Sequence, residues 1–227
     1  MNEIFSTESK YYRVATELSF MLSLGALVLV FSLPIVTLGP SMAAGYYVAT
    51  KRKSGYDQYL VRSFIKSYRE NFVHGIIMTV ILGVIGILLF LNAGILGDGE
   101  GGIFSLVFSL VLLLIAIQWT IMSIFAFPLL ARFEQSGLRS LRSALLLGNR
   151  HLKTSISCII VFLVIGFLGF LTGIVLPFAL GIYIYFTSGM FVRVFRVHYP
   201  DFDRNISDET VRQAAEAAEM KGVDTSE

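Results

Sequence analysis

The residues that could most readily bind a ligand lie where two prolines interrupt a long apolar segment. Pro34 and Pro40 lie six residues apart, with Thr37 and Gly39 between them. Each proline lacks a backbone N–H and disfavours helix at the residue before it, so nearby peptide carbonyls lose their helical partners. We favour a simple helix stop, in which Thr37 satisfies one freed carbonyl. The alternative is an unwound segment whose carbonyls contact a solute or an ion.

Three further polar positions stand in or beside the apolar blocks. Gln118 lies near the middle of the third block, where it predicts either an interhelical hydrogen bond or the polar lining of a solute path. Asn71 precedes the second block, and Arg132 follows the third. The candidate functional residues are therefore Pro34, Thr37, Gly39, Asn71, Gln118 and Arg132.

The sequence argues against catalysis and against metal or cofactor binding. No Asp, Glu, Lys or Arg stands at mid-depth in an apolar block, which leaves no group there for proton transfer. The glycine-rich phosphate loop, HExxH and GxSxG are all absent, and the single Cys158 excludes an intrachain disulfide or a CxxC pair. We therefore expect no enzymatic activity, no cofactor and no metal. Nucleic acid is not expected as a partner either, because membrane topology already explains the cations.

The elements that must position these residues are membrane helices. The chain is 55% hydrophobic and only 15% charged, and its apolar residues form long blocks that could cross a bilayer. The block 154–192 is too long for one crossing and divides at Thr172-Gly173, with Pro177 in the first turn of the last helix. Five spans are predicted, near residues 18–38, 72–93, 103–130, 155–171 and 174–192.

Two segments between the spans have the pattern of amphipathic helices. In Tyr56–Phe72 and in Gly137–Leu152, apolar residues recur at helical spacing and cations occupy another face. Such helices either lie at the inner leaflet, with their cations toward anionic lipid headgroups, or cap the bundle. The predicted fold class is an all-α polytopic membrane bundle of about five transmembrane helices with two amphipathic inner-leaflet helices. Whether residues 34–50 form a re-entrant or a sixth membrane segment stays open.

The distribution of the cations predicts an orientation. Lys and Arg concentrate between spans one and two, between spans three and four, and after span five, whereas residues 94–102 contain none. Cytoplasmic loops are rich in Lys and Arg, so we expect the C-terminus inside and the N-terminus outside a bacterial plasma membrane. Residues 1–200 form the transmembrane domain, and 201–227 a cytoplasmic tail. In that tail Ser207 is expected to cap a short helix, followed by disorder.

Several ordered patterns at the span ends resemble the YesL family of bacterial integral membrane proteins, a domain of unknown function. The resemblance covers roughly residues 10–200. It implies a context of carbohydrate uptake and breakdown, because members are often found beside genes for these processes, but it implies no reaction and no site residues. The patterns are "LPIVTLG" (33–39), "AGYY" (44–47), "SFIKSYRENF" (63–72), "FPLLARF" (127–133) and "LRSALLLGNRHL" (141–152).

These observations together predict a non-enzymatic accessory component of carbohydrate uptake. Its expected partners are the lipid bilayer, anionic lipids at the inner leaflet, and a sugar transporter complex or further copies of itself. The alternative is a small sugar transporter in its own right. It would act as a homo-oligomer, because five short helices enclose little space.

Overall fold

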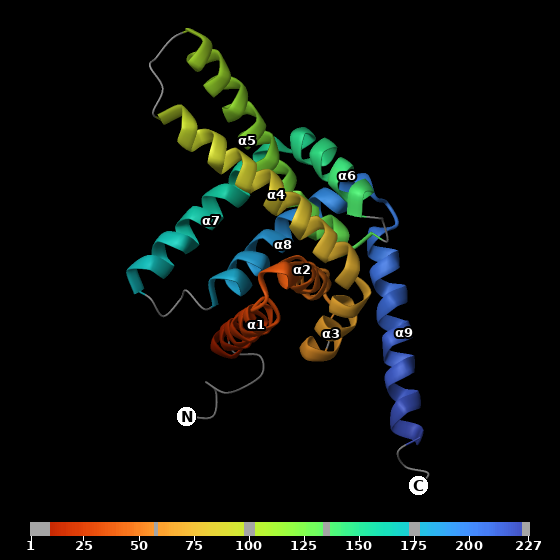
Figure 1. Cartoon of the computed structure of the whole chain (residues 1–227). Helices are drawn as coiled ribbons and strands as arrows, with labels where there is room; N and C mark the ends of the chain where they lie inside the picture. Colours follow the sequence, from red (N-terminus) through yellow and green to blue (C-terminus); the bar gives the residue numbers. More distant parts are fainter. Residues whose placement is uncertain (1–9, 57–58, 98–102, 134–136, 173–177, 224–227) are drawn as a thin grey trace.

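The computed structural model describes residues 10–56, 59–97, 103–133, 137–172 and 178–223, and the elements in these ranges are all helical (Figure 1). The predicted all-α class is confirmed. The helices are α1 (Lys10–Phe31), the short 3₁₀ helix η1 (Ile35–Thr37), α2 (Leu38–Lys53), α3 (Leu60–Glu70), α4 (Phe72–Gly97), α5 (Ile103–Leu130), α6 (Gly137–Arg150), α7 (Leu152–Thr172), α8 (Ala179–His198) and α9 (Phe202–Val223).

Five of these helices are long and apolar enough to cross a membrane, which confirms the predicted spans and makes the chain a multi-pass membrane protein. The first span begins and ends earlier than expected, and the last begins and ends later. The predicted turn after Thr172, with Pro177, falls in 173–177, outside the described residues. The spans are Val14–Phe31, Phe72–Ala93, Ser105–Leu130, Leu152–Leu171 and Ala179–His198.

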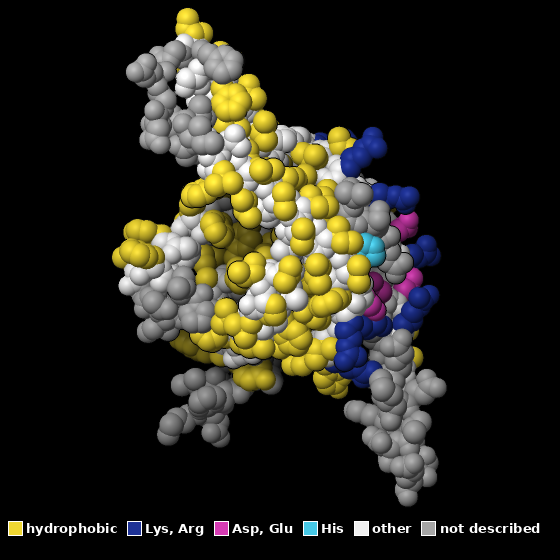
Figure 2. Space-filling view, in the orientation of Figure 1, with side chains coloured by type: hydrophobic (Ala, Val, Ile, Leu, Met, Phe, Trp, Pro, Cys, Tyr) yellow, Lys and Arg dark blue, Asp and Glu magenta, His cyan; other side chains and the backbone are white. Residues whose placement is uncertain are grey.

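The outer surfaces of these spans fit a lipid environment. Large apolar side chains such as Phe90, Leu114 and Phe170 on α4, α5 and α7 are exposed. Figure 2 shows hydrophobic side chains over most of the visible face, with Lys and Arg gathered near α6, α9 and the end of α8. An apolar belt with one strongly basic end is the pattern expected of a membrane bundle.

The centre of the bundle is occupied by α2, a helix that covers most of the residues 34–50 whose arrangement the sequence left open. Every residue from Gly39 to Lys51 is buried, and α2 packs against α1, α3, α4, α5 and α8. Its residues Ala43, Ala44 and Gly45 are small, which lets the neighbouring helices approach its backbone closely. α2 is not among the five apolar spans, because its 16 residues are too few for a full crossing and its last turn holds Lys51, Arg52 and Lys53.

The proline segment forms the turn of a helical hairpin. α1 ends at Phe31, where the first span was expected to continue to Leu38, and Pro40 stands in the first turn of α2, where proline is tolerated. The Thr37 hydroxyl is shared between the carbonyl oxygens of Phe31 and Pro34, each 2.7 Å away. This confirms a capping role for Thr37 and the helix stop that we favoured.

The hairpin changes the expected sidedness of the first helix. α2 runs back along α1, so that Arg52 Nη2 lies 2.9 Å from Glu17 Oε1. The sequence had placed Glu17 outside and Arg52 inside the membrane, and this contact contradicts that separation. The start of α1 and the end of α2 therefore lie at the same end of the bundle, because the chain reverses at Pro34 and α2 returns along α1.

The two amphipathic helices pack onto protein, which supports the bundle-capping alternative. α3 buries Phe64 against Phe31, with ring centroids 5.4 Å apart, and α6 buries Leu141, Ala144 and Leu147. α6 also makes extensive contact with α5. Their apolar stripes are thus largely covered by other helices, while cations such as Arg62 and Arg142 remain exposed.

The tail helix starts earlier than predicted. α9 begins at Phe202, so Ser207 lies inside the helix and the predicted cap at Ser207 is wrong. Phe202 and Ile206, four residues apart, are both buried and anchor this first turn against the bundle. Pro200 explains the break from α8, because the residue before a proline is biased away from helix.

Candidate functional site

The most unusual polar arrangement in the described residues lies at the C-terminal end of α2. The side chains of Lys51 and Arg132 are 0% and 3% exposed, and both contact Glu209 of α9. Three elements far apart in the sequence meet there: the end of α2, the residues after α5, and the tail helix. Charged groups are rarely buried without partners, so this cluster is a candidate functional site.

Arg132 is held from three directions. Its Nε donates to Thr50 Oγ1 at 2.7 Å, and Nη2 donates to the carbonyl oxygen of Tyr47 at 2.9 Å. Nη1 lies 3.3 Å from Glu209 Oε2. The guanidinium also stands over the Tyr47 ring, 4.8 Å from its centroid, and 5.8 Å from the Phe202 centroid. These contacts fix Arg132 in one orientation and tie the end of α5 to α2.

Glu209 is the point where the cluster converges. Its Oε2 lies 3.3 Å from Lys51 Nζ and accepts a hydrogen bond of 3.2 Å from the Tyr47 hydroxyl, in addition to Arg132. All three contacts are longer than usual for a carboxylate, which accepts from N–H⁺ donors at about 2.7–2.9 Å and from O–H donors at about 2.5–2.7 Å. Glu209 is 43% exposed, so the carboxylate closes a buried cationic site from the water side.

The electrostatics of the two cations follow from burial. Burial lowers the pKa of Lys51 to about 8; Glu209 opposes this shift, and the like charge of Arg132 adds to it. Burial likewise lowers the pKa of Arg132 to about 10, again opposed by Glu209. Both pKa values show that the protonated forms are costly here. An anionic group beside the cations is what keeps them charged.

The chemistry open to this cluster is therefore the binding of a carboxylate or phosphate group. A guanidinium, an ammonium and a phenol that meet at one oxygen make a suitable donor set for such an anion. The described residues contain no group of three His, Cys, Asp or Glu that could hold a metal ion. In this structure the anion is supplied by the chain's own tail.

A second ion cluster lies on the other face of α2. Arg52 donates to Glu17 through Nη2 at 2.9 Å and through Nε at 3.3 Å, and the Tyr185 hydroxyl donates to Glu17 Oε2. Lys53 Nζ stands 3.6 Å from the Tyr185 ring centroid. This cluster joins α1, α2 and α8 and is partly open, with Arg52 20% and Glu17 33% exposed.

The structure does not bring the six predicted residues into one site. Pro34, Thr37 and Gly39 lie at the α1–α2 turn, and Asn71 lies between α3 and α4, with Nδ2 donating to Ser67 O at 3.1 Å. Gln118 is half-buried on α5, 14 residues before Arg132 and so away from the buried cation cluster. Of the six, Arg132 alone joins the buried cation cluster.

The region around Gly39 is a packing contact. A side chain at Gly39 would strike the Gly75 carbonyl and the Thr79 hydroxyl of α4. A Cβ added at Gly75 would in turn lie 2.6 Å from the backbone nitrogen of Pro40. Glycine is needed at both positions because the backbones of α2 and α4 touch. The Gly39–Pro40 end of the proline segment therefore serves the close packing of α2 on α4.

Sequence reasoning missed Lys51, Tyr47, Thr50 and Glu209. Lys51 was counted with the loop cations, and Glu209 was expected in the first turn of a solvated helix. One local signal was available, since Tyr47 lies four residues before Lys51 and so on the same helical face. The contact with Glu209 had no local signal, because it joins residues 162 apart in the chain.

Comparison with known proteins finds one family of unknown function that matches part of the chain. A family model described as "Protein of unknown function, DUF624" matches residues 15–93, about a third of the chain, from α1 to α4. This match includes the hairpin and Lys51 but not Arg132 or Glu209. No curated protein and no solved structure matches the chain. The comparisons thus indicate similarity to a family of unknown function and assign no activity.

Proposed function

We propose that this membrane protein is a non-enzymatic accessory component of carbohydrate uptake in a bacterial plasma membrane. The observation that carries the proposal is the position of α2, whose residues Gly39–Lys51 are all buried at the centre of the bundle. A helix in that position fills the space that a conduit would need. The carbohydrate context rests on the resemblance to the YesL family.

The tail helix α9 offers a surface for a partner. α9 is anchored by Phe202 and Ile206 and linked to the cation cluster through Glu209. Because Glu209 is partly exposed and its contacts are long, a partner with its own carboxylate or phosphate group could replace it. We propose that docking of this kind connects the membrane bundle to an uptake complex.

Co-purification tests the partner. The full chain is crosslinked in its native membranes, and the proteins attached to it are identified by mass spectrometry. We expect subunits of a carbohydrate permease, captured more efficiently by Glu209→Gln, which removes the tail's competing carboxylate from Lys51 and Arg132. Arg204→Glu, an exposed charge reversal on α9, is the matched control. Capture of no transport protein by the wild-type chain would contradict the accessory role.

Topology is proposed with the C-terminus in the cytoplasm and the start of α1 on the same side. Single cysteines at Asp98, Arg139 and Tyr11 in a Cys158→Ser background report sidedness through an impermeant thiol reagent. Asp98 should react from outside, whereas exposed Arg139 and Tyr11 should not. External labelling at Arg139 would overturn the orientation, and external labelling at Tyr11 alone would overturn the placement of α1.

A second candidate function is a small sugar transporter that acts as a homo-oligomer. It is favoured by a cavity of about 250 Å³ between α2, α5, α7 and α8, which Trp119, Thr120, Ser123 and Tyr183 help to line. Figure 2 shows the surface hollowed between α5 and α7. An aromatic ring with nearby hydroxyls is a suitable lining for a sugar, but most of this cavity is apolar.

Transport by the purified protein separates the two functions. The full chain is reconstituted in vesicles, and entry of radiolabelled mono- and disaccharides is measured. We expect no uptake above that of empty vesicles. Uptake that is lost in Ser123→Val but retained in Ser109→Val, an exposed serine on the same helix, would replace the accessory role by the transporter.

A further inference from the structure

A cavity of about 370 Å³ lies between the start of α7 and the end of α8, apart from both ion clusters. Its polar lining includes His151, Lys153, Thr154 and Ser157 from the α7 side and Arg193 from α8. Its size falls in the range of about 300–1,000 Å³ that is usual for small-molecule sites. In the described part of the chain, no acidic side chain lines it.

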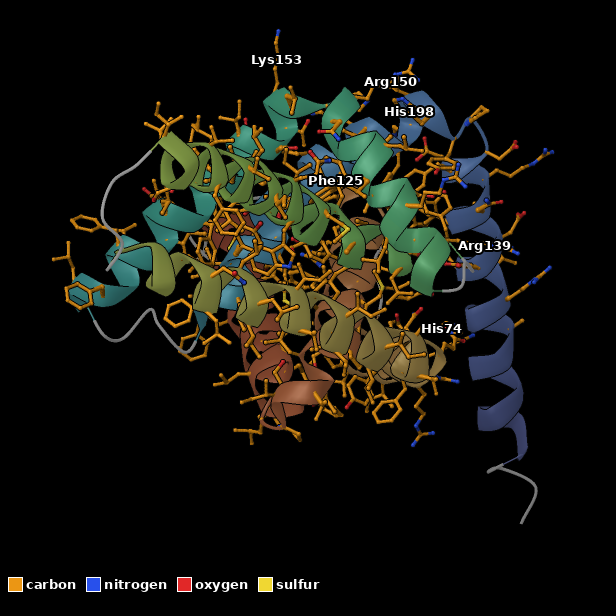
Figure 3. The ribbon with its side chains drawn as sticks, turned by 45° about the horizontal axis from the view of Figure 1, so that its top comes forward. His74, Phe125, Arg139, Arg150, Lys153 and His198 are labelled. Atoms are coloured by element: carbon orange, nitrogen blue, oxygen red, sulfur yellow. The ribbon has the colours of Figure 1, made fainter. Side chains whose placement is uncertain are left out.

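The surroundings of the cavity are strongly basic. Figure 3 shows Lys153 projecting from the start of α7, at the same edge of the molecule as Arg150 and His198. His151 Nε2 lies 3.5 Å from His198 Nε2, and the Nδ1–H of His198 donates to the Val194 carbonyl at 3.1 Å. Burial lowers the pKa of His151, and the neighbouring His198 and Arg150 lower it further. An anion in this cavity would relieve that repulsion.

The other side of the cavity is apolar and continues along the lipid-facing surface of α7. Met190, Val194 and Val197 of α8 complete the lining. Ile156 and Ile160, three and seven residues after Lys153, are exposed on the same face of α7. A ligand with its charge between Lys153 and Arg193 could therefore extend its apolar part along α7 among the lipids.

We propose that this cavity binds the phosphate group of an anionic phospholipid, with Lys153 and Arg193 as the cationic contacts and the acyl chains along α7. Thr154 supplies a hydroxyl to the phosphate oxygens, and Ser157, whose hydroxyl donates to the Lys153 carbonyl at 2.8 Å, lines the cavity beside it. The cavity stands at the basic end of two membrane spans, the depth at which headgroups meet Lys and Arg. The proposal is independent of the accessory role.

The test uses the full-length protein in detergent, titrated with short-chain phosphatidylglycerol. Bound lipid is counted by native mass spectrometry, and the shift in Tm is recorded in parallel. We expect phosphatidylglycerol to bind at least roughly tenfold more tightly than phosphatidylcholine of equal chain length. Lys153→Gln with Arg193→Gln should weaken phosphatidylglycerol binding on the order of 25-fold, about fivefold for each cation. High salt should weaken it as well.

Two controls separate this site from other sources of anion binding. Arg139→Gln with Arg142→Gln removes two exposed cations of α6 and should leave the affinity unchanged. Inorganic phosphate alone should not raise the Tm. An equal loss in the α6 variant, or equal affinity for phosphatidylcholine in the wild-type protein, would overturn the proposal. Equal protection by inorganic phosphate would overturn the lipid as the occupant. The wild-type titrations decide the matter even if the cavity variant fails to fold.

Discussion

Lys51 and Arg52 are neighbours in the sequence, yet they enter two ion clusters of different character. Lys51 shares Glu209 with Arg132 in a site where both cations are almost fully buried. Arg52 meets Glu17 through two nitrogens at a partly open position. Successive residues on a helix differ by about 100° in direction, so one run of cations supplies both faces of α2.

The two clusters differ in how deeply their charges are buried and in the length of their ionic contacts. In the Lys51 cluster, two buried cations face a carboxylate at 3.3 Å, and burial lowers the pKa of both. In the Arg52 cluster, a shorter, two-nitrogen contact stands where water still reaches it. The first cluster is therefore poised to accept another anion, and the second fastens the hairpin to α8. Four changes test this assignment.

Arg132→Met should have the largest effect. It removes the hydrogen bonds of the guanidinium to Thr50, the Tyr47 carbonyl and Glu209 together, and hydrogen bonds to a charged group contribute about 1.5–3 kcal/mol each. Unfolding in detergent followed by circular dichroism measures the loss. Arg196→Met, which breaks an exposed pair with Asp203, should cost less than about 1 kcal/mol. Equal losses in the two variants would show that burial of Arg132 contributes nothing.

Glu209→Gln should cause the next largest loss of folding stability, about 1–3 kcal/mol, because both cations lose their negative partner. Release of α9 is the expected structural consequence, and it is measured as faster proteolysis after Phe202. Asp203→Asn on the same helix is the control, and it should leave the proteolysis rate near that of the wild-type chain. Unchanged protection of α9 in Glu209→Gln would mean that Phe202 and Ile206 hold it alone.

The pH response should be smaller and confined to the Lys51 cluster. The pKa of Lys51 is about 8 in the folded chain and near 10.5 when unfolded, so the unfolded chain binds this proton more tightly. The free-energy cost of burying protonated Lys51 is present in full below pH 8. The stability of the fold should therefore rise as the pH increases from about 8 toward 10.5. Melting temperatures between pH 7 and 9.5 measure this trend. The rise should disappear in Lys51→Met, and an identical rise in that variant would assign it to other groups.

Glu17→Gln should have the smallest effect, about 1 kcal/mol or less, because partly exposed ion pairs contribute little. The Tyr185 contact with Glu17 is kept in weaker form by the amide. Thermal unfolding in detergent beside the Glu209→Gln variant gives the comparison directly. A loss as large as that of Glu209→Gln would make the two clusters equivalent.

The apolar blocks predicted the five spans well, because an uncharged run of about 20 residues has few other uses. The central helix was not predictable in this way. The stretch Gly39–Lys51 is rich in small residues and contains no long apolar run, and its burial depends on neighbours such as α4, α5 and α8. Local pattern carries no information about such tertiary burial, so the sequence left open whether residues 34–50 form a re-entrant or a sixth membrane segment.

The candidate site was predictable only in part. Arg132 was named because it directly follows a span, but its contacts with Thr50 and Tyr47 join residues more than 80 apart. The predicted helix cap at Ser207 was wrong for a different reason. Ser207 had the right residue type for a cap, but burial of Phe202 and Ile206 starts α9 five residues earlier. Packing overrode a local preference.

The burial of α2 has a consequence for how the chain is made. α2 is not among the five apolar spans, and during synthesis it emerges before α4, α5 and α8, which bury it. The Tyr46 hydroxyl pairs with Thr187, which the ribosome adds 141 residues later. The packing of α2 therefore cannot be complete until α8 has been synthesised. A chain truncated before α8 would lack both the hydroxyl partner of Tyr46 and the helix face on which α2 packs.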